Sequence, residues 1–209
     1  MVDAAVVIDY QNIHLTAHGR FCLDGEPKHE CLIHPVHFAN QVLDARRSAR
    51  AVAGLGLEER PSLTTVSAFR GLPSNKHQPE SYRRNQAHKS EWTKDRRVEV
   101  VYRPLRYNFA GDGSWEAQEK GIDVQVALQV LRLTQTGRYG LVILAAHDTD
   151  QEPTLEYAMQ LPDVQSGAVL IETAGWHQCK RLRTPGGRLW HTVLDRICFD
   201  RSIDRKVYS

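Results

Sequence analysis

The sequence predicts an α/β fold in which a mainly parallel sheet lies between layers of helices. Short apolar runs alternate along the chain with segments whose apolar residues recur at helical spacing. The run at residues 141–146 contains no polar side chain, which is typical of a strand buried on both faces. Strands joined through helices run parallel, and their right-handed crossovers put helices on both faces of the sheet.

The first part of the chain predicts two strands and one helix. Residues 4–9 are an apolar run that ends in an acid, which indicates a buried strand. Residues 20–34 contain the turn pair Asp24-Gly25 and are expected to form an insertion, with a hairpin as one form of it. Pro35 begins a helical pattern, since proline is well tolerated at the first helical position. Residues 62–69 are rich in β-branched side chains and predict a second strand.

The same alternation continues after residue 70. Residues 103–120 contain Gly111-Asp112-Gly113, a turn that predicts either a small hairpin or a mobile loop. The other expected elements are a loop at 73–80, a basic helix at about 80–94, a strand at 98–102, a helix at 122–136, a strand at 141–146, a helix at 153–161 and a strand at 168–171.

The chain of 209 residues is long enough for one domain with a sizeable core. We expect this domain at residues 1–175, with the insertion at about 20–34 and the loop at about 103–120. Residues 176–209 are expected to be a basic C-terminal extension that packs on the domain through a short amphipathic element around 189–197.

Composition and cysteine usage predict a cytoplasmic protein without a membrane segment. No apolar run approaches the roughly 20 residues that span a bilayer, and no basic region precedes the first apolar stretch. The cysteines are widely spaced and form no CxxC pair, which suits a reducing compartment. They are Cys22, Cys31, Cys179 and Cys198.

Charge is distributed unevenly behind a formal net charge of +2. Residues 70–106 hold 10 basic and 4 acidic side chains, and residues 176–209 hold 8 basic and 3 acidic ones. Between them, residues 107–175 hold 10 acidic and 3 basic side chains. Either these blocks are solvated faces, or carboxylates hold a cation while the basic blocks hold phosphates.

Four aspartates stand where an open parallel sheet binds ligands, beyond the carboxyl ends of its strands. Asp9 ends the first expected strand, Asp148 and Asp150 follow the strand at 141–146, and Asp123 begins a helix. Carboxylates that meet at one edge repel one another, and a hard cation such as Mg²⁺ or Mn²⁺ removes that cost. Each aspartate alone also fits a turn or a helix cap.

Other constellations are weaker. Cys22, His29, Cys31, His34 and His37 could ligate zinc, but their spacing matches no common zinc finger. The Asp148-Thr149-Asp150 sequence comes too late in the chain for a phosphotransferase of the haloacid dehalogenase type. The chain contains neither a phosphate-binding GxxxxGK[ST] loop nor a GxSxG nucleophile elbow.

Three blocks together resemble the NYN domain, a family of the PIN-like nuclease superfamily. They are Val6-Val-Ile-Asp-Tyr-Gln-Asn12, Lys120-Gly-Ile-Asp-Val-Gln-Val-Ala-Leu128 and Gly140-Leu-Val-Ile-Leu-Ala-Ala-His-Asp-Thr-Asp150. The resemblance covers roughly residues 4–175 and implies a PIN-like (Rossmann-like) α/β/α sandwich. His147 and Gln151 depart from the family pattern, in which a small and an apolar residue are usual.

The resemblance implies a metal-dependent ribonuclease in which Asp9, Asp123, Asp148 and Asp150 are the catalytic residues and hold Mg²⁺ or Mn²⁺. Single-stranded RNA is the expected substrate, because unpaired bases can stack on aromatics such as Tyr82, Trp92 and Tyr107 among the basic residues. The alternative is that Trp92 packs in the core and the basic side chains are solvated. The expected substrate-binding residues are Asn12, Arg70, Lys120, Thr149, Arg83 and Arg84. The alternatives are a catalytically inactive RNA-binding module and an interaction module regulated by a protein partner; a homo-oligomer also stays open.

Overall fold

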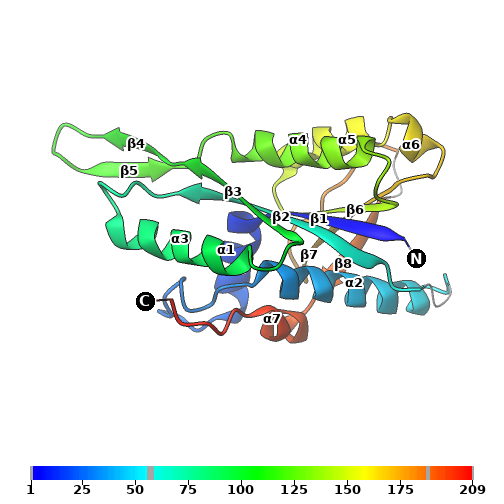
Figure 1. Ribbon diagram of the computed structural model, residues 1–209, viewed down its shortest axis with the longest axis horizontal. Coiled ribbons are helices and arrows are strands. Elements are labelled where there is room, and N and C mark those ends of the chain that lie inside the picture. The colour runs from blue at the N-terminus through cyan, green and yellow to red at the C-terminus, as the bar shows by residue number, and fades with distance from the viewer. Residues whose placement is uncertain (1, 56–58, 187–188, 209) are drawn as a thin grey trace.

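Six parallel strands form the central sheet of the computed structural model, which describes residues 2–55, 59–186 and 189–208 (Figure 1). Their order across the sheet is β3-β2-β1-β6-β7-β8. The strands are β1 (Asp3–Asp9), β2 (Ser62–Leu72), β3 (Val98–Pro104), β6 (Leu141–Ala145), β7 (Leu170–Trp176) and β8 (Trp190–Leu194). The expected α/β fold with a parallel central sheet is confirmed.

Helices cover both faces of this sheet, so the molecule is an α/β/α sandwich (Figure 1). One face carries α1 (Tyr10–Phe21), α2 (Pro35–Val52), α3 (Pro79–Trp92) and α7 (Arg196–Ser202). The other carries α4 (Ile122–Gln135), α5 (Glu152–Ala158), α6 (Pro162–Gln165) and the short 3-10 helix η1 (Thr149–Gln151).

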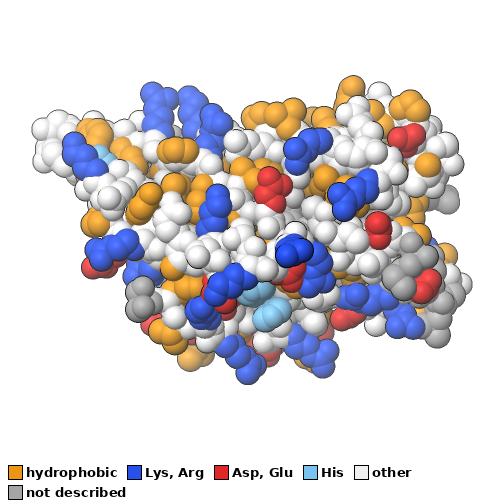
Figure 2. Space-filling model, viewed as in Figure 1, with side chains coloured by type: hydrophobic (Ala, Val, Ile, Leu, Met, Phe, Trp, Pro, Cys, Tyr) orange, Lys and Arg blue, Asp and Glu red, His pale blue; other side chains and the backbone are white. Residues whose placement is uncertain are grey.

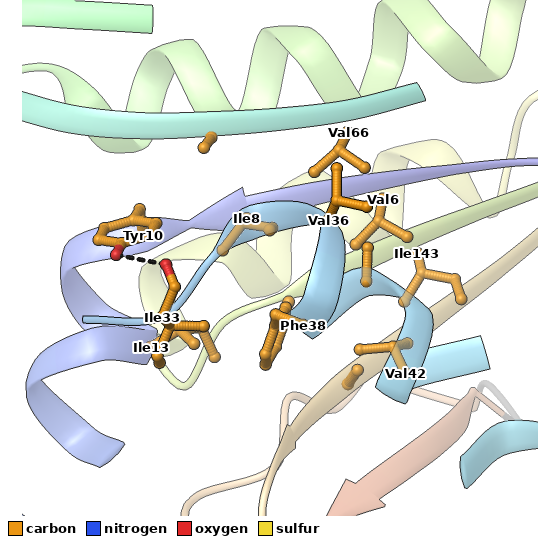
Figure 3. Packing of buried hydrophobic residues seen from close by; sticks show 14 of the residues in the cluster. Val6, Ile8, Tyr10, Ile13, Ile33, Val36, Phe38, Val42, Val66 and Ile143 are labelled. Carbon is orange, nitrogen blue, oxygen red and sulfur yellow. Dashed lines mark hydrogen bonds between the residues drawn. The ribbon is translucent and has the colours of Figure 1, made fainter. Parts of the chain in front are cut away.

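The core lies in two layers because strand side chains alternate between the faces. Val6 and Ile8 of β1 pack with α1 and α2, as Figure 3 shows, and Val7 packs with α4 on the opposite side. The Tyr10 hydroxyl donates to the carbonyl of Ile33 at 2.6 Å within the first layer (Figure 3). β1 is therefore buried on both faces, as its apolar sequence predicts.

The segment between β1 and α2 differs from the expectation. Residues 10–21 form α1, which the sequence did not predict, and residues 22–34 hold a turn at Asp24-Gly25 but no hairpin. Asp9 caps α1, and Tyr10, Ile13 and Ala17 bury one side of the helix. Packing and a cap therefore stabilise a helix whose composition alone is a weak signal.

The last part of the chain belongs to the sheet. Residues 190–194, expected in a basic extension after residue 175, form β8 and pair with β7 in parallel. Helix α7 follows and packs on α2. Residues 103–120 contain the hairpin alternative: β4 (Arg106–Phe109) pairs antiparallel with β5 (Trp115–Gln118) in an arm that extends from the domain (Figure 1).

No helix among the described residues has both the length and the apolar character needed to span a membrane.

Candidate active site

The carboxyl ends of β1 and β6 form the position at which an open parallel sheet binds ligands. From β1 the chain winds through β2 to β3 on one side, and from β6 it winds through β7 to β8 on the other. The reversal leaves a crevice at the ends of the two central strands. Asp9 is the last residue of β1, and Asp148 follows β6 by three residues.

Asp9 is buried at the centre of this edge and is only 4% exposed. Its Oδ1 accepts a hydrogen bond from the backbone N–H of Asn12 at 3.2 Å. The pKa of the Asp9 carboxyl is raised to about 7, and burial is the main cause. Repulsion from the carboxylates of Asp123, Glu119 and Asp148 adds to the effect of burial.

The other three expected aspartates lie on two neighbouring segments. Asp123 is in the first turn of α4, and Asp148 caps η1 by accepting from the backbone N–H of Asp150 at 3.0 Å. Partial burial raises the pKa of Asp123, and the charges of Asp148 and Asp150 raise it further. The structure therefore brings the four aspartates to the same edge of the sheet.

Glu119 is a fifth acid at this edge that the sequence reasoning missed. Its Oε1 accepts from the backbone N–H of Gly71 at 2.7 Å, and burial followed by repulsion from Asp123 raises its pKa. A Cβ at position 71 would meet the side chains of Glu119 and Leu105, so the absence of a side chain there leaves room for this approach. The only signal for Glu119 in the sequence was its position directly before Lys120, the first residue of the second block that resembles the NYN domain.

Asn12 and His147 fix the two central segments relative to each other. Asn12 Oδ1 accepts from the backbone N–H of His147 at 2.8 Å, which joins α1 to the segment after β6. The His147 Nε2 accepts from the backbone N–H of Trp176 at 3.2 Å, and its Nδ1 donates to the carbonyl of Lys180 at 3.0 Å. Burial lowers the pKa of His147, which favours this neutral ring.

Gln151 joins the aspartates on η1 to the one on α4. It is buried, and its Nε2 donates to the backbone carbonyl of Asp123 at 3.1 Å. An apolar residue here could not make this bond. His147 and Gln151 thus both hold the backbone of the acidic edge in place.

The carboxylates are neighbours but are not packed as tightly as metal ligands. Among the described residues, one such tight group of donor side chains is found elsewhere. The ligand atoms of His18, Cys22 and Cys31 all lie within 4.8 Å of one another. No three of the described acids at this edge have ligand atoms this close together.

Arg70 brings positive charge to the same edge. Its guanidinium stacks over the ring of Tyr10, 4.5 Å from the centroid, and its Nη1 lies 3.2 Å from Nδ1 of His88. Burial raises the pKa of Glu119, and the charge of Arg70 is a smaller effect that lowers it.

A basic hollow of about 690 Å³ adjoins the acids and is lined by Thr149, Glu152, Cys179, Lys180, Arg181 and Arg183. The Lys180 Nζ donates to the hydroxyl of Thr149 at 3.3 Å, one residue from Asp148. The backbone N–H of Arg183 donates to Glu152 at 3.0 Å. The excess of basic residues after residue 176 was visible in the sequence, but its location was not.

The remaining expected substrate-binding residues are spread over the surface. Lys120 is exposed at the start of α4, and Figure 2 shows Lys and Arg side chains over the region where the β4–β5 hairpin meets α4. Arg84 lines a separate hollow of about 400 Å³ with residues 203–208, and Arg83 and Arg84 line a smaller one with Tyr208.

The expectation that Trp92 stacks on RNA bases is wrong. Trp92 is fully buried, and its Nε1 donates to Asp204 Oδ2 at 2.7 Å. It packs against Tyr10 and His88 in the layer beneath Arg70. A buried indole cannot reach a base, and the alternative role in the core is the observed one.

The sequence matches no protein-family model, and no curated protein matches it. A solved structure with a similar fold is that of a protein of unknown function from Vibrio parahaemolyticus. The TM-score is 0.53 at 14% sequence identity, and the match covers 97% of this chain and 96% of that one. The likeness supports the fold and carries no statement about activity.

Proposed function

We propose that this protein is a divalent-metal-dependent ribonuclease, similar to the NYN family, that hydrolyses phosphodiester bonds of single-stranded RNA in the cytoplasm. The observation that carries the proposal is the buried Asp9 carboxyl, with a pKa raised to about 7, among other acids at the topological switch of the sheet. A buried carboxylate with other acids near it destabilises the fold unless positive charge compensates it. This cost favours a role for Asp9 in binding a cation.

The chemistry of the donor set fits Mg²⁺ or Mn²⁺, which prefer oxygen ligands. Asp9 and Asp148 are the best candidates for direct ligands, because they lie at and just after the ends of the two central strands. Asp123, Asp150 and Glu119 would act directly or through water. When bound, such a cation activates water and stabilises charge on the phosphate.

The chain's own residues orient the reacting groups. Asn12 and Gln151 hold the acid-bearing segments in register through their hydrogen bonds to backbone. Arg70 is restrained by stacking on Tyr10, so its guanidinium can bind a phosphate without losing much further freedom. Lys180, Arg181 and Arg183 offer positive charge to the adjoining RNA backbone.

Replacing Asp148 by asparagine is expected to lower the rate of RNA cleavage by at least about 100-fold. Loss of a ligand should exceed the 10- to 100-fold cost that is typical when a residue supporting a ligand is lost. The measurement is cleavage of short single-stranded RNAs with Mg²⁺ or Mn²⁺, and EDTA should abolish it.

Asp163→Asn is the matched control, because Asp163 is an exposed acid on α6, outside the acidic edge. It should cleave as the parent does. If Asp148→Asn cleaves at the parental rate, or if EDTA has no effect, the nuclease proposal is wrong. RNA binding without cleavage by the parent would favour the inactive RNA-binding module instead.

Replacing Arg181 and Arg183 together by alanine should weaken RNA binding uniformly across sequences. Each lost phosphate contact is expected to reduce the slope of log affinity against log salt by about 0.7 for single strands. Fluorescence anisotropy of labelled RNA at several salt concentrations measures this slope. Arg47→Ala on α2 is the control, as Arg47 is exposed and away from the hollow. An unchanged slope would show that this hollow does not hold RNA.

A further inference from the structure

A histidine and two cysteines meet at the end of α1, apart from the acidic edge. The ligand atoms of His18, Cys22 and Cys31 all lie within 4.8 Å of one another. Cys22 and Cys31 are joined as a disulfide with their Cα atoms 6.8 Å apart, whereas Cys179 and Cys198 are free. The zinc ligands considered from the sequence included His29, His34 and His37 but not His18, because helix α1 was not predicted.

Two local arrangements bring these donors together. His18 and Cys22 are four residues apart, and the Cys22 backbone N–H donates to the His18 carbonyl at 3.1 Å, so both lie on one side of the last turn of α1. Residues 22–31 then fold back and return Cys31 to the same place, where it is 4% exposed. The donors are therefore held by backbone structure and by burial.

The hydrogen bond of His18 matches that of a metal-binding histidine. Its Nε2 lies 2.7 Å from the backbone carbonyl of Glu26, and a carbonyl only accepts, so Nε2 carries the proton. Nδ1 is left with its lone pair. A ligating imidazole usually donates its other N–H to a carbonyl or carboxylate, which fixes the ring and its tautomer.

We propose that His18, Cys22 and Cys31 form a zinc site in the reduced chain and that oxidation to the Cys22–Cys31 disulfide releases the ion. Two thiolates and an imidazole are ligands that select Zn²⁺ rather than Mg²⁺ or Mn²⁺. Three protein ligands leave the fourth tetrahedral position to water or to a small ligand. The predicted reducing compartment keeps the cysteines as thiols.

The redox step balances with hydrogen peroxide as the oxidant. Each thiolate loses one electron, and the two sulfur atoms join in a disulfide bond. The O–O bond of the peroxide breaks, and the peroxide takes up two electrons and two protons to give two waters. The zinc ion loses both thiolate ligands and leaves. A thiol reductant reverses the change.

Cobalt serves as the spectroscopic probe for this site, since Zn²⁺ has no visible absorption. The reduced full-length chain should bind one Co²⁺, with a thiolate-to-cobalt charge-transfer band and the visible bands of tetrahedral cobalt, and Zn²⁺ should displace it. Cys22→Ser and His18→Gln should weaken Co²⁺ binding by at least about 100-fold. Cys179→Ser and Cys198→Ser are the matched controls and should bind as the parent does.

A measurement on the parent chain does not depend on whether the variants fold. Zn²⁺ should protect two of the four thiols from alkylation, and peptide mass spectrometry should identify them as Cys22 and Cys31. One equivalent of hydrogen peroxide should then release the zinc to a chromogenic chelator. Absence of a thiolate–cobalt band, or protection of Cys179 and Cys198 instead, would overturn the proposal. Neither outcome bears on RNA cleavage at the acidic edge.

Discussion

Asp9→Asn is expected to stabilise the folded chain at pH 8 and to remove the RNA cleavage proposed for the acidic edge. The Asp9 carboxyl has an ordinary pKa of 3.8, which the fold raises to about 7, chiefly through burial. The folded state therefore binds this proton more tightly than the unfolded state does. The parent loses stability as the pH rises from about 4 through about 7, and above that range the carboxylate carries its full cost.

The difference between Asp9→Asn and the parent should follow this titration. The difference in the free energy of unfolding should be near zero below pH 4 and grow to about 4 kcal/mol above pH 7, since one pKa unit corresponds to about 1.4 kcal/mol. Asparagine is also a good N-cap, so the bond from the Asn12 backbone N–H to residue 9 can be kept. Urea unfolding across this pH range measures the free-energy difference.

Divalent metal supplies the complementary test of Asp9. Mg²⁺ or Mn²⁺ should raise the unfolding temperature of the parent, because an ion bound only to the folded state stabilises it by mass action. Asp9→Asn should respond much less, and Asp163→Asn should respond fully. Equal stability of Asp9→Asn and parent at pH 8 would contradict the raised pKa. Normal cleavage by Asp9→Asn would remove Asp9 from the site.

Glu172→Gln is expected to destabilise the chain by about 3–5 kcal/mol, which is the cost of leaving a buried charge without its partner. Arg46 on α2 and Glu172 on β7 are both buried, and Arg46 donates two hydrogen bonds to the carboxylate, at 2.7 and 2.8 Å. The more exposed Arg50 lies 3.9 Å from the same carboxylate and adds a second charge. The neutral amide would remove the charge that faces the buried guanidinium of Arg46.

Asp200→Asn is the matched control for this ion pair. Arg196 and Asp200 are exposed and 2.8 Å apart on α7, and such surface pairs contribute at most about 1 kcal/mol. The joint replacement of Arg46 by Met and Glu172 by Leu should recover much of the stability lost in Glu172→Gln, because both members of the buried pair are removed together. A loss below 1 kcal/mol for Glu172→Gln would contradict this account.

The sheet and the four aspartates were predictable because both depend on local signals. The apolar runs identify buried strands; Asp9 ends one of them, and Asp148 comes shortly after another. Helix α1 was missed since His14, Thr16 and Gly19 weaken its local preference, while its cap and its buried face depend on the folded protein. The ends of the strands can therefore be predicted from local sequence pattern, whereas helix α1 beside them depends on packing in the folded protein.

The rest of the site depends on contacts between distant segments. Glu119 reaches the acidic edge only through the path of the β4–β5 hairpin and the close approach at Gly71. Lys180 lies beside Thr149 because β8 pairs with β7 and directs the preceding loop back to the edge. The basic composition of that loop was visible, but neither its partner nor its direction could be obtained from spacing.

The strand order has a consequence for how fast the chain folds. Every neighbouring pair in the six-stranded sheet is parallel, so each pairing requires a long intervening segment to close first. Among the described residues, β4 and β5 form an antiparallel pair joined by a short turn, but this hairpin lies outside the six-stranded sheet. The chain loses conformational entropy in closing these segments before the strand contacts stabilise it. This topology therefore belongs with folds that assemble in milliseconds to seconds rather than microseconds.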